Sequence, residues 1–207
     1  AAVPSLGLHV LPAAVTALRQ RQPALGVELR SVHHHEVFAR LYERDCELAI
    51  VYDPQPQPRL QVIELVRAQL MVLAPIGLLG TPGQAVGLDA LQGRPMVGLT
   101  SSGPLGELFA AAVEQAGVVL DEAVTSQTYA IGAALTAHGA GPCVVDEFTA
   151  RAHASAQLGV HPLRPALEFP VCCVHLEDRP LSPAASQLID AFQAVIATLR
   201  NGSHAPA

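Results

Sequence analysis

Three hydroxyl-bearing residues, Thr100, Ser101 and Ser102, stand between an apolar run at 96–99 and a stretch with helical spacing at 104–116. The apolar run predicts a buried strand, and the spacing predicts an amphipathic helix. The turn between them would present hydroxyl groups and unpaired backbone N–H groups at the start of a helix, which is a favourable place for a carboxylate or another small anion. Capping of the helix by Thr100 or Ser102 is the alternative role, and the two roles are compatible.

Histidines supply the next candidates. His33, His34 and His35 are consecutive, which invites a metal-binding interpretation. Consecutive residues rarely point at one ion, however, and no second cluster with ligand spacing accompanies them. We therefore interpret them as a solvated loop at a strand end with one histidine facing a binding site, and we expect no metal. His9 is a candidate ligand contact, with a capped structural histidine as the alternative.

Two acidic residues, Asp146 and Glu147, follow an apolar run at 143–145. They could hold the amino or guanidino group of a ligand, which would make the ligand amino-acid-like. The alternative is that they are acids at a helix N-terminus, where the helix dipole favours negative charge.

Catalytic and cofactor chemistry finds little support. All 12 basic residues are arginines, so the segment holds neither a Schiff-base lysine nor a P-loop lysine. Ser101, His9 and Asp53 carry the chemical groups of a triad, but no Gly-x-Ser-x-Gly elbow is present and no spacing supports the arrangement. The four cysteines form no C-x-x-C pair and are interpreted as buried reduced thiols. We expect no catalytic residues, no metal and no cofactor.

Composition limits the partners. The chain has 207 residues, of which 50% are apolar, and a net charge of −6. It carries no basic stripe with interleaved aromatic residues, so by itself it should not grip nucleic acid. It has no apolar run long enough for a membrane span and no export signal at its first residues, so we expect a cytoplasmic protein without membrane contact.

The apolar patterns predict two α/β halves of similar wiring. In the first half, we expect strands at 6–10, 26–32, 48–52, 60–66 and 70–74 and helices at 11–22 and 36–44. In the second half, we expect strands at 96–99, 118–125 and 143–145 and helices at 88–91, 104–116, 128–138 and 146–153. A strand at 169–176 and a helix beginning at Ser182 and Pro183 would then return to the first half.

These elements give an α/β fold of two Rossmann-like lobes joined by two crossing segments. We place lobe I at 1–75, lobe II at 76–165, the return to lobe I at 166–200 and a frayed tail at 201–207. Two lobes joined twice leave a cleft between them, in which ligands commonly bind.

Four stretches in this order resemble the effector-binding domain of LysR-type transcriptional regulators. They are LHVLPAAVTALRQRQPALGVELRSV, EVFARLYERDCELAIVYDP, LDALQGRPMVGL and AIGAALTAHGAGPCVVDEFTAR. The resemblance extends over residues 3–200 and implies the type 2 periplasmic-binding-protein fold. Where the family usually has Gly and Asp, this chain has Asp45, Cys46 and Glu47, and we expect Glu47 to take the acidic role. The helix-turn-helix domain that family members carry before this one is absent from the chain.

The resemblance implies a small-molecule effector held between the lobes. Thr100, Ser101 and Ser102 match the family's hydroxyl-bearing turn, which holds an effector carboxylate. Further contacts are implied on both lobes, namely Gln127, Thr128 and Tyr129 at a helix start, Leu8 and His9 at the end of the first strand, and residues 31–33, including His33, at the end of the second.

By the same resemblance, the domain forms a homodimer or homotetramer and acts on DNA only through a domain outside this chain. An exported solute-binding protein of an ABC transporter is an alternative with the same fold, and a small-molecule enzyme is a second alternative. A DNA-binding domain encoded upstream, a signal peptide or turnover of a ligand would distinguish the three.

Overall fold

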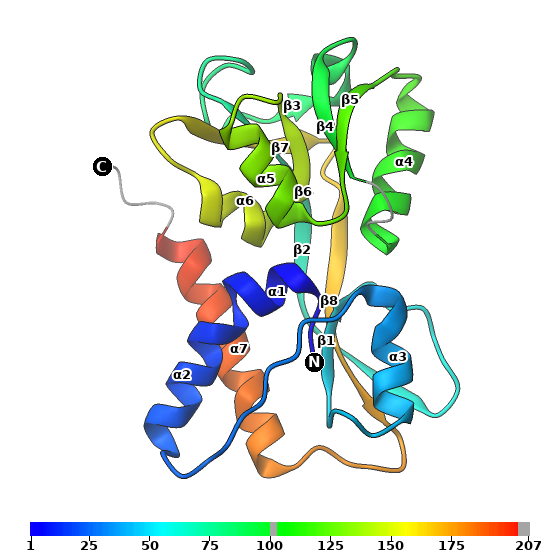
Figure 1. The fold of residues 1–207 in the computed structure, drawn as a ribbon, viewed down its shortest axis with the longest axis vertical. Coiled ribbons are helices and arrows are strands. Elements are labelled where there is room, and N and C mark those ends of the chain that lie inside the picture. The colour runs from blue at the N-terminus through cyan, green and yellow to red at the C-terminus, as the bar shows by residue number, and fades with distance from the viewer. Residues whose placement is uncertain (100–102, 203–207) are drawn as a thin grey trace. The chain divides into compact units, whose positions relative to one another are not determined.

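The computed structural model describes residues 1–99 and 103–202 (Figure 1). The chain forms two compact units, of which unit 1 comprises Ala1–Val66 and Pro170–Ala207 and unit 2 comprises Arg67–Phe169. Two strands, β2 (Leu60–Pro75) and β8 (Glu168–Leu176), carry the chain between the units. The mixed α/β organisation, in which the chain leaves its first unit and later returns to it, agrees with the predicted fold. The crossings were expected near residues 75 and 165.

Unit 1 places helices around a small set of strands. Apart from its parts of β2 and β8, it contains α1 (Pro4–His9), α2 (Leu11–Arg21), α3 (His34–Tyr42), β1 (Ala49–Tyr52) and α7 (Pro183–Gly202). β1 and β8 are antiparallel, with Ile50 opposite Cys173. α7 packs against α2, so the last helix returns to the first unit as its amphipathic pattern predicts.

The start of α7 is held by two side chains. Ser182 accepts a hydrogen bond from the Ala185 N–H at 3.2 Å, which confirms the predicted cap before Pro183. The Glu47 carboxylate accepts a hydrogen bond from the Ser182 N–H at 2.8 Å. The helix dipole also favours an acid at this position. Glu47, which lies just before β1, therefore links the start of that strand to the last helix.

Segment 4–9 is the helix α1, and the predicted strand at 6–10 is wrong. In a strand, Leu6, Leu8 and Val10 would share one face. Instead Leu6 and Val10 are fully buried while Leu8 is 58% exposed, which is the four-residue spacing of a helix. Pro4 lies in the first turn, where proline fixes a helical φ and loses no hydrogen bond.

The strand predicted at 26–32 is reduced to one bridge. Ser31 pairs in parallel with Ala2, and Ala2 also pairs in parallel with Ile50. Parallel pairing in this half is therefore limited to single bridges, and Ala2, rather than the predicted strand at 6–10, provides the first segment. Val27 and Leu29 are 38% and 39% exposed. Such partial burial gives little apolar free energy to offset the entropy lost on ordering a strand.

The two strands predicted at 60–66 and 70–74 are one continuous strand, β2. Residues 67–69 contain neither glycine nor proline, so nothing interrupts the extended backbone between the two apolar runs. The interruption in hydrophobicity marks the passage from unit 1 to unit 2 rather than a turn.

Unit 2 is built on a mixed sheet rather than the all-parallel sheet expected from alternating strands and helices. β6 (Cys143–Asp146) is parallel to β4 (Pro95–Leu99) and antiparallel to β2. β4 is also parallel to β5 (Asp121–Ser126). Two strands were not predicted, namely β3 (Val86–Gly87) and β7 (Leu158–Arg164), which pair with each other. The helical elements are η1 (Leu88–Leu91), α4 (Pro104–Ala116), α5 (Tyr129–Ala137) and α6 (Glu147–His153).

The unit 2 strands present different side chains to their two faces because residues alternate along a strand. Val97 and Val145 belong to a compact buried cluster with residues of α5 and α6. Their neighbours Met96 and Val144 line a pocket shared with α4, which Val97 also borders. α4 has the predicted bounds, and Gly117 after it adopts the predicted left-handed conformation, with a φ of 63°.

The cysteines are thiols in this structure, and three of them are buried. Burial raises the pKa of Cys143 and of Cys173 to about 12. Such thiols stay protonated at neutral pH and are poor nucleophiles, as the apolar strands around them predict. Cys46 departs from the prediction because it is partly exposed. Of the helices in the described part of the chain, none is long and apolar enough to cross a membrane.

The approach of Gly141 to β4 provides a test of the unit 2 packing. Gly141 has a φ of +111°, and a Cβ there would lie 2.3 Å from the Pro95 carbonyl oxygen. We expect Gly141→Ala to lower the free energy of unfolding by roughly 3 kcal/mol, because it adds a main-chain clash to backbone strain.

Gly139→Ala is the matched control, because Gly139 has a φ of +86° but no atom within 4 Å of its Cβ position. It should cost only about 1 kcal/mol of strain. Urea unfolding followed by circular dichroism measures both changes. Equal losses would show that the close approach to Pro95 is absent.

Candidate functional site

The parallel strands of unit 2 end at one edge of its sheet. Leu99 of β4 is paired with Ser126 of β5, and Val97 of β4 with Cys143 of β6. A helix begins after each of these strands, namely α4, α5 and α6. Ligands of open α/β sheets bind outside the carboxyl ends of strands, where loop side chains and helix N-termini converge. This edge is the candidate site of unit 2.

Thr100, Ser101 and Ser102, the predicted carboxylate-binding turn, lie outside the described residues. Their flanking elements are those predicted, because β4 ends and α4 begins next to the turn. Gly103, which precedes α4, has a φ of 62°, a conformation that glycine adopts at little cost. The strand and the helix are thus confirmed, and the role of the three hydroxyl groups stays a prediction.

Gln127, Thr128 and Tyr129 form the start of α5, as predicted. Thr128 is the N-cap, and its hydroxyl accepts a hydrogen bond from the Ile131 N–H at 3.3 Å. Gln127 is exposed, whereas Thr128 and Tyr129 are half-buried. Polar groups at the start of α5 are therefore accessible at the same edge at which β4 ends.

A close approach fixes the start of α5 against the sheet. A Cβ on Gly132 would lie 3.3 Å from Leu99 Cδ2 and 3.4 Å from Ser126 Oγ. Ser126 is buried, and its hydroxyl donates to the Thr128 carbonyl at 3.3 Å. The absence of a side chain at Gly132 and the Ser126 hydroxyl together hold Thr128 in register with the strand ends.

Asp146 joins β6 to α6 and is fully buried. Its Oδ1 accepts hydrogen bonds from the N–H groups of Phe148 and Thr149, both at 3.0 Å, and its Oδ2 accepts one from the Thr149 hydroxyl at 2.7 Å. Asp146 thus lies at a helix N-terminus, which was the alternative considered for it, and the three bonds show that it also caps the helix. They support a role in positioning α6 at the candidate site.

In unit 1, the structure changes the location of His9. Leu8 and His9 lie in the last turn of α1 and not at the end of a strand. Leu8 is largely exposed, while His9 is half-buried. Ligand contact by His9 stays a prediction.

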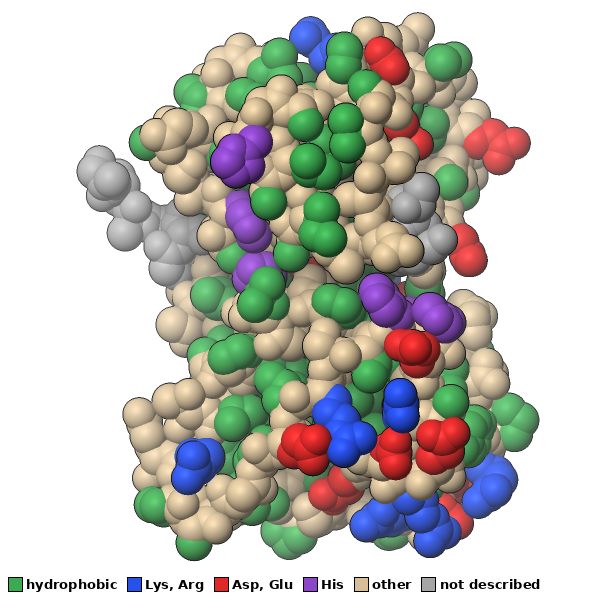
Figure 2. Space-filling view, viewed as in Figure 1, with side chains coloured by type: hydrophobic (Ala, Val, Ile, Leu, Met, Phe, Trp, Pro, Cys, Tyr) green, Lys and Arg blue, Asp and Glu red, His purple; other side chains and the backbone are tan. Residues whose placement is uncertain are grey.

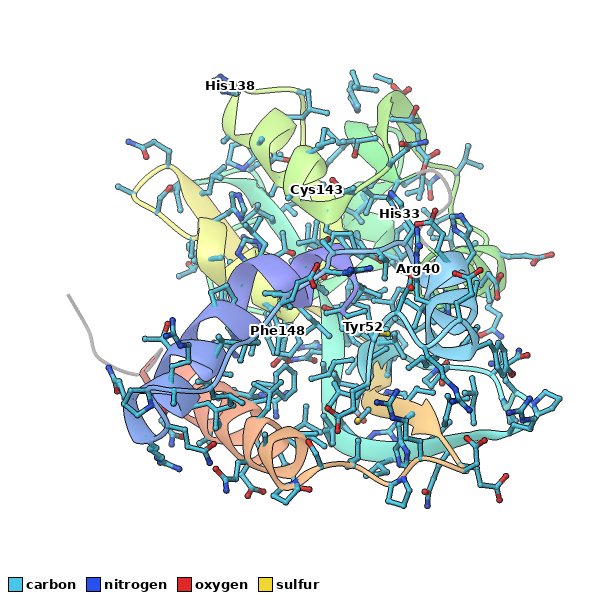
Figure 3. All side chains as sticks on the ribbon, turned by 60° about the horizontal axis from the view of Figure 1, so that its bottom comes forward. His33, Arg40, Tyr52, His138, Cys143 and Phe148 are labelled. Carbon is cyan, nitrogen blue, oxygen red and sulfur yellow. The ribbon has the colours of Figure 1, made fainter. Side chains whose placement is uncertain are left out.

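His33 was expected at the end of a second strand, but only a bridge at Ser31 remains of that strand, and His33 is the residue directly before α3. It is exposed, and its backbone N–H donates to the Glu36 carboxylate at 3.3 Å. Its ring stacks on that of His35, with the ring centroids 6.0 Å apart. Figure 3 shows His33 at the start of α3 and Arg40 further along the same helix. No group of side chains among the described residues has the arrangement of a metal site.

A polar pair that the sequence analysis missed lies at the start of α1. Ser5 is buried, and its hydroxyl is 2.8 Å from the hydroxyl of Tyr52 at the end of β1. The pair joins the start of α1 to a strand end, as Thr128 does in unit 2. The Pro4–Ser5 dipeptide is a helix-start signal that could have identified this position.

The charged surface of unit 1 is of mixed sign (Figure 2). Asp45 lies 3.0 Å from Arg40 and 3.6 Å from Arg30, and all three side chains are more than one-third exposed. Exposed pairs of this kind add little to stability. Alternating signs also differ from the basic stripe on which nucleic-acid binding depends.

The comparison that decides the family is the match to a sequence profile described as LysR substrate binding domain, which extends over residues 1–197. The chain belongs to this family. It is also 31% identical over 189 residues to the HTH-type transcriptional regulator DgcR of Pseudoalteromonas sp. That match covers 91% of this chain and 64% of DgcR, so the chain spans less than two-thirds of the length of this curated relative.

Solved structures show the same fold. The C-terminal domain of a probable LysR family regulator from Rhodococcus sp. RHA1 matches with a TM-score of 0.75 and 23% identity, over 92% of this chain and 95% of that one. The PA01 protein of Pseudomonas aeruginosa, a putative LysR family regulator, matches with a TM-score of 0.80 and 17% identity, over 95% of this chain and 70% of that one.

This LysR substrate-binding domain is therefore the effector-binding domain of a transcriptional regulator. The family distinguishes it from exported solute-binding proteins and from enzymes. Its fold is of the type 2 periplasmic-binding-protein kind, as the resemblance implies.

Asp146 caps α6 and Thr128 caps α5, and the first side chain is buried more deeply than the second. This difference provides a second test. Asp146→Ala would leave three buried donors without their acceptor, so we expect a loss of roughly 3 kcal/mol in the free energy of unfolding. Thr128→Ala removes one half-exposed hydrogen bond that water can replace, and it should cost about 0.5–1 kcal/mol. Chemical unfolding of both variants measures the difference. Similar losses would contradict the structural role of Asp146.

Proposed function

We propose that this domain senses a small carboxylate-bearing molecule. The observation that carries the proposal is the placement of accessible polar groups at the start of α5, beside the paired ends of β4 and β5. Backbone N–H groups at a helix start favour an anion. The Thr128 hydroxyl and the Gln127 side chain can add hydrogen bonds to the carboxylate oxygens.

From the resemblance to LysR effector-binding domains, we propose that residues of both units contact the effector. Thr100, Ser101 and Ser102 and the start of α5 supply the unit 2 side. His33, and in the prediction also His9, supply the unit 1 side. Binding to groups on both units would favour one arrangement of the units over others, which is how an effector could change the output of the regulator.

An amino-acid-like effector would require an acceptor for its amino group. Asp146 and Glu147 were the candidates for this contact. The Asp146 carboxylate already accepts three hydrogen bonds at the start of α6. We therefore propose a carboxylate as the recognised group and leave the remainder of the effector unspecified.

The third test measures carboxylate binding by isothermal titration with acetate, propionate, succinate and benzoate. Gln127→Ala and Thr128→Val should each weaken the best binder about fivefold, because each removes one hydrogen bond to the anion. Gln115→Ala is the matched control, since Gln115 is an exposed glutamine on α4.

For unit 1, His33→Ala should weaken the same ligand, whereas His138→Ala should not. His138 is an exposed histidine that follows α5 and is labelled in Figure 3. The proposal fails if carboxylates bind no better than the corresponding amides, or if the Gln115 and Gln127 variants behave alike.

The whole regulator has further proposed partners. The relative named as an HTH-type transcriptional regulator is longer than this chain, so we propose that DNA is bound by a domain outside these residues. A regulator that meets DNA in a bacterial cell acts in the cytoplasm. Family resemblance also supports a homodimer or a homotetramer formed through this domain.

Exposed apolar side chains give the dimer proposal a physical basis. Val119 of unit 2 is 74% exposed, and Leu29 of unit 1 is 39% exposed. Contact with a second chain would remove such surface from water. We expect multi-angle light scattering to give twice the chain mass at high protein concentration. A monomer mass throughout a dilution series would contradict the proposal.

A further inference from the structure

The strongest unexplained feature of unit 2 is the incomplete burial of α4. Its apolar side chains follow a one-face helical spacing, yet Leu105 alone among them is buried. Leu108, Phe109 and Val113 remain half-exposed. A helix with this pattern normally buries such a face against its sheet. Here a space separates the helix from part of the strand surface below it.

That space is a pocket of about 400 Å³ that lies wholly within unit 2. Its floor is formed by the buried side chains of Leu70, Met96 and Val144. Phe109 and Val113 of α4 form the opposite wall. Figure 1 shows α4 on one side of β4 and β5, with α5 and α6 on the other side. The volume is within the range of small-molecule sites, which are mostly apolar with a few polar groups.

One carboxylate borders this apolar space, on a residue that is itself exposed. Glu122 of β5 lines the pocket beside Gly98 of β4. A Cβ on Gly98 would lie 2.5 Å from the Glu122 carboxyl carbon. The absence of a side chain at Gly98 therefore leaves room for the Glu122 carboxylate above β4. Glu114 of α4 is the second acidic group of the lining. No arginine is among the lining residues that the structure describes.

We propose that this pocket is a second ligand site, which takes an apolar molecule ending in a protonated amine. The apolar body would occupy the space between α4 and the strands and complete the burial of the helix face. The ammonium group would lie against Glu122, with Glu114 adding negative potential. An anionic end group would meet two carboxylates and no cation, so this chemistry is opposite to that of the carboxylate proposed at the strand ends.

The experiment uses three ligands that differ only in their end group, namely hexylamine, hexanol and hexanoate, titrated into the 207-residue chain at neutral pH. Hexylamine should bind best. Hexanoate should bind at least about tenfold more weakly than hexylamine, because attraction to the carboxylates becomes repulsion. Equal affinities for the three, or no binding of the amine at millimolar concentration, would overturn the proposal.

Two variants locate the binding. Ala110 lines the pocket but is itself exposed, so Ala110→Trp can obstruct the pocket without repacking the core. It should abolish binding of all three ligands. Glu122→Gln should reduce hexylamine affinity to that of hexanol, while leaving hexanol unchanged. Glu107→Gln is the control, because Glu107 is an exposed acid of α4 outside the pocket lining.

An unchanged hexylamine affinity in both Ala110→Trp and Glu122→Gln would place the binding elsewhere and refute the site. The unfolding midpoint of each variant confirms that it is folded. The lining includes Leu99 and Tyr129, which border the proposed effector site, whereas Gln127 lies outside the lining. Gln127→Ala should therefore leave hexylamine binding unchanged and separates the two proposals. Loss of carboxylate binding together with intact amine binding would refute only the effector proposal.

Discussion

The register between the parallel strands of unit 2 is the constraint on which the candidate site depends. Pairing of Leu99 with Ser126 brings the ends of β4 and β5 level, and β6 joins them through Val97 and Cys143. Each strand is then followed by a helix whose first N–H groups lack intrahelical partners. A shift of one residue in this pairing would reverse which side chains face α5 and would remove Thr128 from the edge. The polar character of the site is thus a consequence of strand register.

The two faces of that sheet differ in how closely their helices approach. On the α5 side, Gly132 lies against Leu99 and Ser126, and the buried cluster includes Val97, Val145 and Ala133. On the α4 side, a pocket of about 400 Å³ separates Phe109 and Val113 from the strands. A close-packed face resists displacement, whereas an open one can change its packing at small cost. The structure therefore combines a fixed support for the strand ends with a helix whose packing a ligand could complete.

The polar side chains near the strand ends have separate tasks. The carboxylate oxygens of Asp146 accept hydrogen bonds from the start of α6, and the Ser126 hydroxyl donates one to the Thr128 carbonyl. Both are buried, so their hydrogen bonds maintain the edge. Gln127 and Thr128 remain accessible and suit ligand contact better. Burial, rather than residue type, separates the supporting groups from those that can meet an effector.

The amino-acid sequence alone determined those elements whose apolar spacing fits only a helix or only a strand. The helix α4 and its terminating Gly117, the capped helix α7, and the β5–α5 connection at Gln127 and Thr128 follow directly from apolar spacing and from cap and turn residues. The order of the motifs also indicated the family. The sequence could not decide the short segments at 6–10 and 26–32, because a run of five to seven residues fits a strand and a helix alike until its neighbours are known. Tertiary packing decided these, burying Leu6 and Val10 while exposing Leu8, and leaving a single bridge at Ser31. It also decided that Asp146, whose capping partners Phe148 and Thr149 are close in the sequence, is fully buried, and that a pocket lies beneath α4. Burial and the pocket both depend on groups far apart in the chain that only the folded structure brings together.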